Sequence, residues 1–303
     1  MGQTPMLRRM RTPLILISLL LALIGCNGKA GQNARTPYTG PTLPMYDIVQ
    51  RINQNNSKIT SLWSSAEMEA GIVDEKGERH NEVLSGNLLY RPQRDLLVVA
   101  TKPAVGRVFE LGSNNDVYWM SMRVGPDTAW WGHYRNLGMP CAQEIQIRPD
   151  LIVQVLGVSV IGSDFNAPPV PVMRFNPDAD AYMFVWNGKL PDRWVAVKEV
   201  WYDRVTLTPR LVLLFDENGR VVLRAYLADH QPVKTPQLPE AQWPKVARNY
   251  RLYFPETGSR LVLNLTDVAL TGPRNVPNDR SFSFSPDRTQ TSKVIQLDEA
   301  CGG

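Results

Sequence analysis

The sequence predicts a mainly β fold: a curled antiparallel sheet of about eleven strands, with one helix before it and a short helix inserted in its middle. Three observations predict it. Between residues 64 and 268, apolar residues recur with a period of two. Short turn sequences that end in glycine separate these runs and favour antiparallel hairpins: Asp74-Glu75-Lys76-Gly77, Asp216-Glu217-Asn218-Gly219 and Pro255-Glu256-Thr257-Gly258. A flat sheet rarely holds so many strands, so the sheet should curl.

The first 25 residues have the layout of an export signal that is removed. Three arginines between residues 8 and 11 precede an apolar segment that runs from Leu14 to Ile24. At about eleven residues, this segment is too short to cross a bilayer core of ~30 Å as a permanent helix. It ends at Leu23-Ile24-Gly25-Cys26, which is similar to the lipobox of bacterial lipoproteins.

The lipobox resemblance implies that Cys26 becomes the first residue of the mature chain and is acylated on its thiol and its new amine. Three acyl chains would hold the protein on a membrane. A secretory signal with an unrelated cysteine is the alternative. The next residue is Asn27 rather than the aspartate associated with inner-membrane retention. We therefore expect a lipid-anchored, periplasm-facing protein of the bacterial cell envelope, at the outer membrane.

Charge and composition describe the rest of the chain. The signal contains three of the 33 basic residues and none of the 29 acidic ones, which leaves 30 basic against 29 acidic residues. Nucleic acid is therefore not an expected partner. Residues 26–44 comprise the lipidated cysteine and a Gly-, Pro- and Asn-rich flexible linker. We expect one domain over residues 45–297 and a short tail over 298–303.

A helix should open this domain. Ile48, Val49 and Ile52 form an apolar stripe after Pro44, a residue that suits a helix start. The period then changes to two. Strands with one covered and one solvated face are expected in the segments 66–72, 84–90, 221–227 and 261–265.

The segment IRPDLIVQVLGV, residues 147–158, interrupts the strand pattern and predicts a short helix. Pro149 and Asp150 favour its start, and Gly157 favours its end. Its apolar side, which includes Leu151 and Val155, needs a surface to pack against. The concave face of the curled sheet is the expected surface.

Several segments, in this order along the chain, resemble the LolA/LolB-like lipoprotein carriers and receptors. They are INQNNSKITSLWSSAEME, LSGNLLYRPQRDLLVV, GSNNDVYWM, YRLYFPETGSRLVLNLTDVAL and FSFSPDRTQTSKVIQL. The resemblance implies a half-barrel sheet whose apolar concave face is covered by helices that act as a lid. It also implies that Arg91, beside Pro92 at a strand end, helps to latch this lid. The alternative for Arg91 is a side chain that extends its charge into water. No enzyme activity belongs to the family as a whole.

Alternation within the strands identifies the side chains that would line a cavity for acyl chains, with Leu151 and Val155 on the lid above them. Apolar, dry surfaces of this kind shield acyl chains without directional chemistry. An ordinary packed core would show the same pattern. The candidate lining residues are Met68, Ile72, Leu88, Phe109, Leu223, Leu252 and Leu263.

The sequence contains no motif for catalysis or metal binding. The three histidines lack the spacing of metal ligands, and no nucleophile elbow or phosphate loop occurs. An alternation of Asn176, Asp178 and Asp180 lacks the glycine and glutamate that a calcium loop requires. We therefore expect no catalytic residue, metal or cofactor. Two questions stay open: whether Cys141 and Cys301 pair, and whether Trp130 and Trp131 are buried or lie at a membrane.

These features favour a lipid-anchored envelope protein that binds acyl chains of lipoproteins or other lipids in an apolar cavity, as a receptor or in local lipid handling. Its expected partners are the membrane through Cys26, the acyl chains, and an envelope protein. The alternative is a structural or interaction lipoprotein that uses the same fold as a scaffold without lipid cargo. We do not expect an enzyme.

Overall fold

The computed structural model describes residues 36–73, 77–142, 145, 147–270 and 277–301. The signal segment, Cys26 and most of the linker lie outside these residues, so the lipobox and the anchor stay predictions. The described residues from Thr39 onward form one compact unit. Neither α-helix within it has the length and apolar character needed to span a bilayer.

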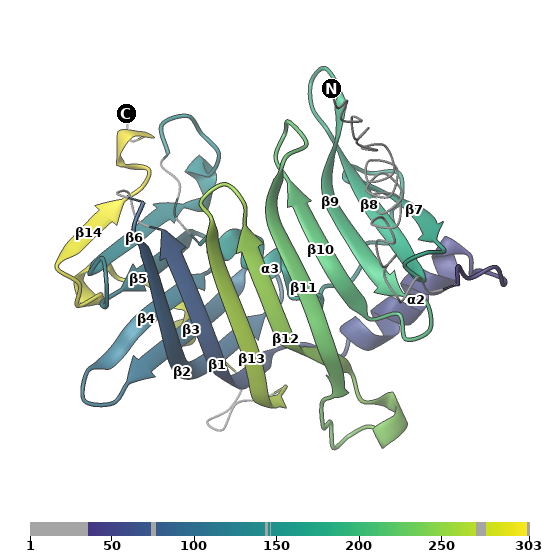
Figure 1. Cartoon of the computed structure of the whole chain (residues 1–303), viewed down its shortest axis with the longest axis horizontal. Coiled ribbons are helices and arrows are strands. Elements are labelled where there is room, and N and C mark those ends of the chain that lie inside the picture. The colour runs from purple at the N-terminus through teal and green to yellow at the C-terminus, as the bar shows by residue number, and fades with distance from the viewer. Residues whose placement is uncertain (1–35, 74–76, 143–144, 146, 271–276, 302–303) are drawn as a thin grey trace, which may run out of the picture. The chain divides into compact units, whose positions relative to one another are not determined.

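A single sheet of fourteen strands dominates the described chain (Figure 1). Its order is β14-β6-β5-β4-β3-β2-β1-β13-β12-β11-β10-β9-β8-β7. All neighbouring strands are antiparallel except β14 and β6. Because β7 and β14 end the sheet without pairing to each other, the sheet is curled but open. The mainly β, half-barrel fold predicted from the sequence is confirmed.

The strand bounds are β1 Leu62–Val73, β2 Arg79–Arg91, β3 Asp95–Lys102, β4 Gly106–Ser113, β5 Val117–Met122, β6 Thr128–His133, β7 Val170–Asn176, β8 Ala181–Lys189, β9 Trp194–Asp203, β10 Pro209–Phe215, β11 Val221–Pro232, β12 Lys245–Phe254, β13 Ser259–Ala269 and β14 Lys293–Gln296.

The sheet has more strands than the about eleven that the alternation signals predict. Some strands show little alternation: in β5, five consecutive residues from Tyr118 to Met122 are buried. The edge strand β7 contains Pro171, and β14 has only four residues. A strand that is buried on both faces, or that lies at the edge of the sheet, does not show the apolar alternation from which strands were predicted.

Two of the predicted hairpin turns are present as expected. Gly219 and Gly258 end them with positive φ angles of 77° and 69°, which glycine adopts without steric cost. The first turn joins β10 to β11, and the second joins β12 to β13. The turn between β1 and β2 lies partly outside the described residues.

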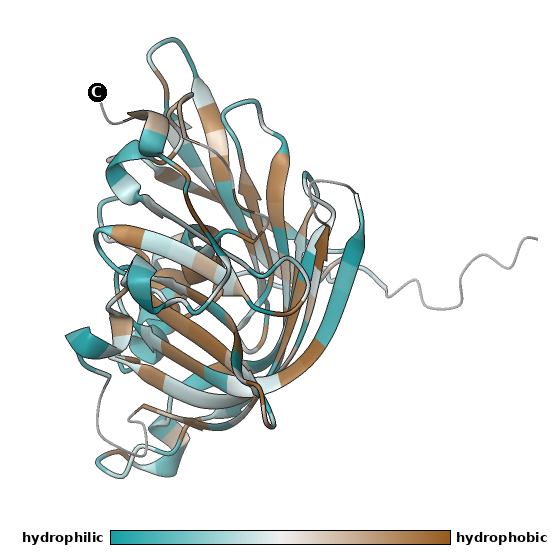
Figure 2. Cartoon of the chain, turned by 90° about the vertical axis from the view of Figure 1, so that its left-hand side faces the viewer, coloured by the Kyte–Doolittle hydropathy of each residue, from teal (hydrophilic) through white to brown (hydrophobic). Residues whose placement is uncertain are grey.

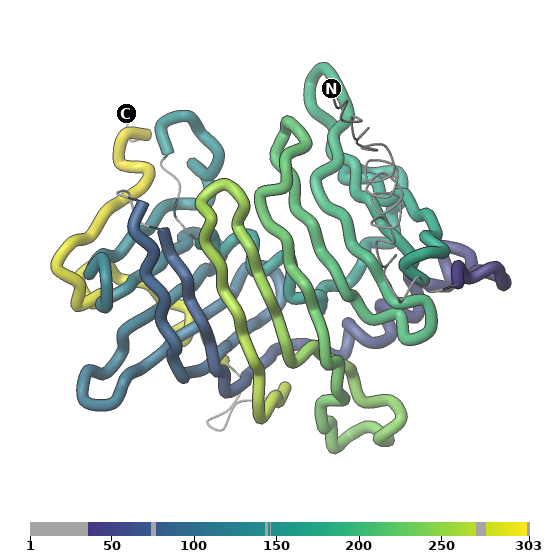
Figure 3. The backbone as a smooth tube through the Cα atoms, in the orientation of Figure 1, coloured from purple at the N-terminus to yellow at the C-terminus, as the bar shows by residue number. Residues whose placement is uncertain are grey.

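Two α-helices pack against the inner face of the sheet: α2 (Met45–Asn56) and α3 (Pro149–Val155). Helix α2 buries Ile48, Val49 and Ile52, which is the predicted stripe. Helix α3 lies in the connection between β6 and β7, which crosses from one end of the sheet to the other (Figure 3). It packs against β3, β4, β5 and β10.

Hydrophobic and hydrophilic residues alternate along the strands of the sheet (Figure 2). On β2, Leu84, Leu88 and Tyr90 are buried in the core, while Val83 and Ser85 on either side of Leu84 are exposed. The core is the inner face together with α2 and α3. We call the opposite side, which carries Leu89 and Leu97, the outer face.

The C-terminal segment, residues 277–301, runs along the outer face, forms β14 and ends in a short 3-10 helix, Glu299–Cys301. Phe284 in this segment stacks on Trp119 of β5, with 5.1 Å between ring centroids. The predicted tail is tied to the sheet through residues 298–301. The buried Asp298 carboxylate accepts hydrogen bonds from the Nδ1 and backbone N–H of His133, and Cys301 forms a disulfide with Cys141.

Candidate functional site

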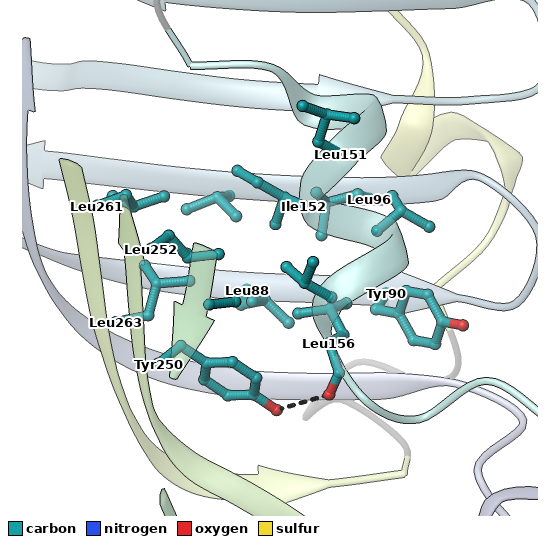
Figure 4. Close-up of a cluster of buried hydrophobic side chains, with 14 of the residues drawn as sticks. Leu88, Tyr90, Leu96, Leu151, Ile152, Leu156, Tyr250, Leu252, Leu261 and Leu263 are labelled. Carbon is teal, nitrogen blue, oxygen red and sulfur yellow. Dashed lines mark hydrogen bonds between the residues drawn. The ribbon is translucent and has the colours of Figure 1, made fainter. Parts of the chain in front are cut away.

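The candidate lining residues lie together on the inner face of the sheet. They come from β1, β2, β4, β11, β12 and β13, and each is at most 2% exposed. All belong to one hydrophobic cluster, which also contains Leu151 and Val155 of α3. Figure 4 shows Leu88, Leu252 and Leu263 on the strands, close to Ile152 and Leu156. Pairing explains this arrangement, because Met68 lies opposite Leu263 across β1 and β13.

Helix α3 covers this surface. Six of its seven residues are buried, and Ile152 and Val155 are fully so. The inner face is therefore closed at this point, with aliphatic side chains of the helix packed on aliphatic side chains of the strands. If α3 moved away from the sheet, an acyl chain could take the place of these helix side chains.

Among the described residues, a small set of side-chain hydrogen bonds attaches α3 and residues 156–161 to other elements, and two of them join the Asn53 amide and the Ile161 backbone. The Tyr250 hydroxyl donates to the Leu156 carbonyl at 3.2 Å (Figure 4). The Lys198 ammonium donates to the Gln154 carbonyl at 2.9 Å. Beyond the helix, the Asn56 amide donates to the Ser159 carbonyl at 2.8 Å. These bonds all lie at the C-terminal end of α3 or after it.

Lys198 has an unusual environment for a basic residue. Its ammonium lies 5.6 Å above the ring of Trp186, and desolvation lowers the pKa of Lys198 to about 8. Along β9, Lys198 occupies the same set of alternating positions as the buried Val200 and Tyr202. Its side chain therefore lies on the inner face. In the part of the chain that the structure describes, no carboxylate pairs with it.

Burial also affects the hydroxyls of this face. It raises the pKa of Tyr250, and Arg248 nearby opposes this increase. Burial raises the pKa of Tyr90 as well. Both groups are therefore neutral over the physiological range, and the bond from Tyr250 to α3 does not depend on pH there.

Arg91 does not contact α3. It follows Tyr90 on β2, and so its side chain lies on the outer face. Its guanidinium pairs with Asp95, donates to Asp279 at 2.8 Å, and lies 5.3 Å from the Phe282 ring centre. The structure therefore places the predicted lid latch against the C-terminal segment instead. A shift of one position along a strand reverses the face on which a side chain lies.

Trp130 and Trp131 are half-buried in β6. Trp130 packs against the inner core, and Trp131 lies against His133 and Phe284. Both residues therefore contribute to packing. Among the described residues, no group of three His, Cys, Asp or Glu side chains could hold a metal ion.

The contacts of Lys198, Tyr250 and Asn56 with α3 and the chain after it are absent from the sequence predictions. Only the lysine had a signal in the sequence, because it occupies an inner-face position of an alternating strand. The tyrosine and the asparagine resemble ordinary core and helix-end residues.

No family model and no curated protein matches this sequence. Comparison with solved structures does find similar folds. A LolA superfamily protein from Nitrosomonas europaea is 12% identical and has a TM-score of 0.45, with 80% of this chain and 99% of that chain covered. A DUF1329 family protein from Desulfovibrio piger is 13% identical and has a TM-score of 0.47, with 78% and 95% covered.

A third structure, named as an outer membrane lipoprotein-sorting protein domain from Vibrio parahaemolyticus, is 11% identical and has a TM-score of 0.41, with 78% and 95% covered. The name of the first structure is that of the family which the sequence motifs resemble. At such identities and TM-scores, the likeness carries no argument about function.

Proposed function

We propose that this chain is a lipid-anchored envelope protein that accepts acyl chains of lipoproteins or other lipids on the inner face beneath α3. Cys26 would hold it on the membrane, and we place it at the outer membrane, facing the periplasm. The role is binding and transfer rather than catalysis. A tethered protein of this kind would act as a receptor or in local lipid handling.

The observation that supports this proposal is the continuous aliphatic surface beneath a helix of only seven residues. Moving α3 away would expose this surface to water, at a cost of roughly 25 cal/mol for each Å² of apolar area. A flexible hydrocarbon chain could replace the helix side chains and remove most of that cost. The polar contacts of α3 are few, so this exchange would break few hydrogen bonds.

A scaffold role without lipid cargo is the second candidate. The near-complete burial of the lining residues supports it, because a permanently filled inner face would look the same. The two candidates differ in whether α3 ever leaves the sheet.

A photoreactive fatty acid distinguishes them. The mature chain from residue 27, exported with a cleavable secretory signal, would be incubated with a diazirine-labelled fatty acid, irradiated and digested. We expect labelled peptides from α3, β12 and β13, on the inner face. A stably folded chain that takes up no label, or is labelled only on its outer face, would favour the scaffold.

Tyr250→Phe tests the role of α3 directly. The variant loses only the hydroxyl that donates to Leu156, so uptake of a fluorescent fatty acid should be faster than in the unmodified chain. Tyr253→Phe is the matched control, because Tyr253 lies on the same strand but is 45% exposed. Equal uptake rates in both variants and in the unmodified chain would argue against a moving α3.

A further inference from the structure

A polar groove lies on the outer face, on the opposite side of the sheet from the proposed acyl-binding surface. Its floor contains Leu89 of β2 and Leu97 of β3, and the C-terminal segment forms its other wall. Three of the contacts that hold this segment lie beside the groove. Phe284 stacks on Trp119, Phe282 is buried, and the Asn114 amide donates to the Phe282 carbonyl at 2.9 Å.

The groove consists of two adjoining pockets of about 370 and 280 Å³. Arg107, Glu110 and Arg288 line both of them. Arg280 lines the larger pocket, and Arg123 lines the smaller one. Four guanidinium groups therefore line the groove, and Glu110 is the single carboxylate among the described residues that line it.

The charge of Glu110 is already compensated. One of its carboxylate oxygens pairs with the Arg107 guanidinium, and the other accepts a hydrogen bond from the Trp119 indole N–H at 2.8 Å. Among the described residues, Arg123 donates to three neutral oxygens: the Val105 carbonyl at 3.4 Å, the Arg107 carbonyl at 3.2 Å and the Gln290 side chain at 3.3 Å. In the part of the chain that the structure describes, three of the four guanidinium groups thus have no carboxylate partner.

Arg280 and Arg288 are the least satisfied of these groups. Within the described part of the chain, neither guanidinium forms a hydrogen bond or an ion pair with another residue. Both side chains belong to exposed residues on the wall formed by the C-terminal segment. Because basic and acidic residues are nearly balanced after the signal, this local excess of positive charge does not follow from the overall composition.

Hydroxyl groups lie among these arginines. Ser121 of β5 and Ser281, Ser285 and Thr289 of the C-terminal segment line the larger pocket. Guanidinium groups bind phosphate oxygens through paired, charge-assisted hydrogen bonds, and hydroxyls donate to the oxygens that remain. A phosphoryl group offers more acceptor oxygens than a carboxylate, which suits this number of donors.

We propose that this groove binds a phosphoryl group attached to a small organic moiety, with Arg280 and Arg288 as its principal ligands. Leu89, Leu97 and Phe284 supply an apolar surface for the organic part. A phospholipid headgroup and a soluble phosphate ester share this chemistry. The site is separate from the inner face, so it does not depend on acyl-chain binding there.

Phosphate binding to the full-length chain tests this proposal. The chain would be held in non-ionic detergent micelles, and equilibrium dialysis would measure binding of radiolabelled inorganic phosphate and glycerol 3-phosphate. A second arm would add phosphatidylglycerol to the micelles and follow tryptophan fluorescence, since Trp119 stacks on Phe284 in the groove wall. Saturation by soluble esters would indicate a free ligand, and saturation by the lipid alone would indicate a headgroup.

The double variant Arg280→Gln/Arg288→Gln should weaken whichever binding occurs by about tenfold or more, since each lost charge-assisted bond is worth about 1.5 kcal/mol or more. Arg174→Gln/Arg224→Gln removes the same charge from exposed positions on β7 and β11, and should leave the affinity unchanged. Ser285→Ala, which keeps the charge, should weaken binding to a smaller degree.

Two results would overturn the proposal. The first is a folded chain that binds none of the three ligands saturably. The second is an equal loss of affinity in both double variants, which would indicate attraction by net charge alone. Thermal unfolding of each variant would establish that it is folded, as the exposure of all four arginines leads us to expect.

Discussion

His230 on β11 is a half-buried imidazole whose protonation the fold opposes. Its Nε2 is shielded from water and has no hydrogen-bond partner among the described residues. Burial lowers the pKa of His230 to about 4, and Lys245 adds to this decrease while Asp229 opposes it. The unfolded chain would titrate near the ordinary value of 6.5.

This difference makes the stability of the fold depend on pH. Between about pH 6.5 and pH 4, the unfolded chain binds a proton that the folded chain does not bind, so the free energy of unfolding decreases as the pH falls through this range. The contribution of His230 is fully present above the upper value. His230→Gln should therefore flatten the decline of the unfolding midpoint between pH 7 and pH 4.5.

Thermal unfolding of both proteins at a series of pH values measures this effect. Changing His80, whose imidazole lies near Gly125, to Gln is the control, since it alters another histidine of the same chain. Parallel curves for the unmodified chain and His230→Gln would contradict the assignment to His230.

Residue positions on a strand were predictable where they depend only on near neighbours. Met68 and Leu263 could be placed on one face because alternation is a local property. The bond from Lys198 to Gln154 spans 44 residues, and the bond from Tyr250 to Leu156 spans 94. Both hydrogen bonds depend on where α3 packs against the sheet, and no local sequence pattern indicates that position.

The pairing of β2 with β3 depends on the absence of one side chain. Gly86 lies opposite Ala100, and a Cβ atom at Gly86 would be 1.8 Å from the Val99 carbonyl oxygen. Backbone atoms cannot give way as a flexible side chain can, so Gly86→Ala should force the strands apart. We expect a loss of about 2–3 kcal/mol in the free energy of unfolding.

Urea unfolding measures this loss. Ser85→Ala, at the exposed neighbouring position on β2, should change the free energy of unfolding by less than about 0.5 kcal/mol. A Gly86→Ala protein as stable as Ser85→Ala would show that the two strands can separate without cost.

The elements were predictable to different degrees. The stripe of α2, the segment of α3 and the glycine turns at 219 and 258 follow local rules, and each is present. The face on which Arg91 lies was not resolved by motif spacing, because a single position decides it. The parallel pairing of β14 with β6 could not be predicted either, since it joins residues 165 positions apart, such as Lys293 and Thr128.

For the whole molecule, the acylated cysteine is the prediction with the largest functional consequence. When the full-length chain is produced in bacteria with radiolabelled palmitate, label should enter the protein. Cys26→Ala should abolish the incorporation, because the thiol that accepts the acyl chains is missing.

Cys141→Ser is the matched control. It removes another cysteine, one that forms the disulfide with Cys301, and should leave the labelling intact. Labelling of the Cys26→Ala protein would refute the lipobox, and the chain would then need another means of membrane attachment.

The pairing of β1 with β13 in the middle of the sheet also determines when the protein can fold. Met68 meets a partner, Leu263, that is synthesised 195 residues later. Until then, a nascent chain can pair β1 only with β2, and the other side of β1 presents unpaired backbone groups. Such an open edge invites pairing with other chains. Prematurely terminated chains would keep this edge exposed, so this topology requires that proteases remove them. Chains that are still being synthesised require a chaperone to protect the edge until β13 is complete.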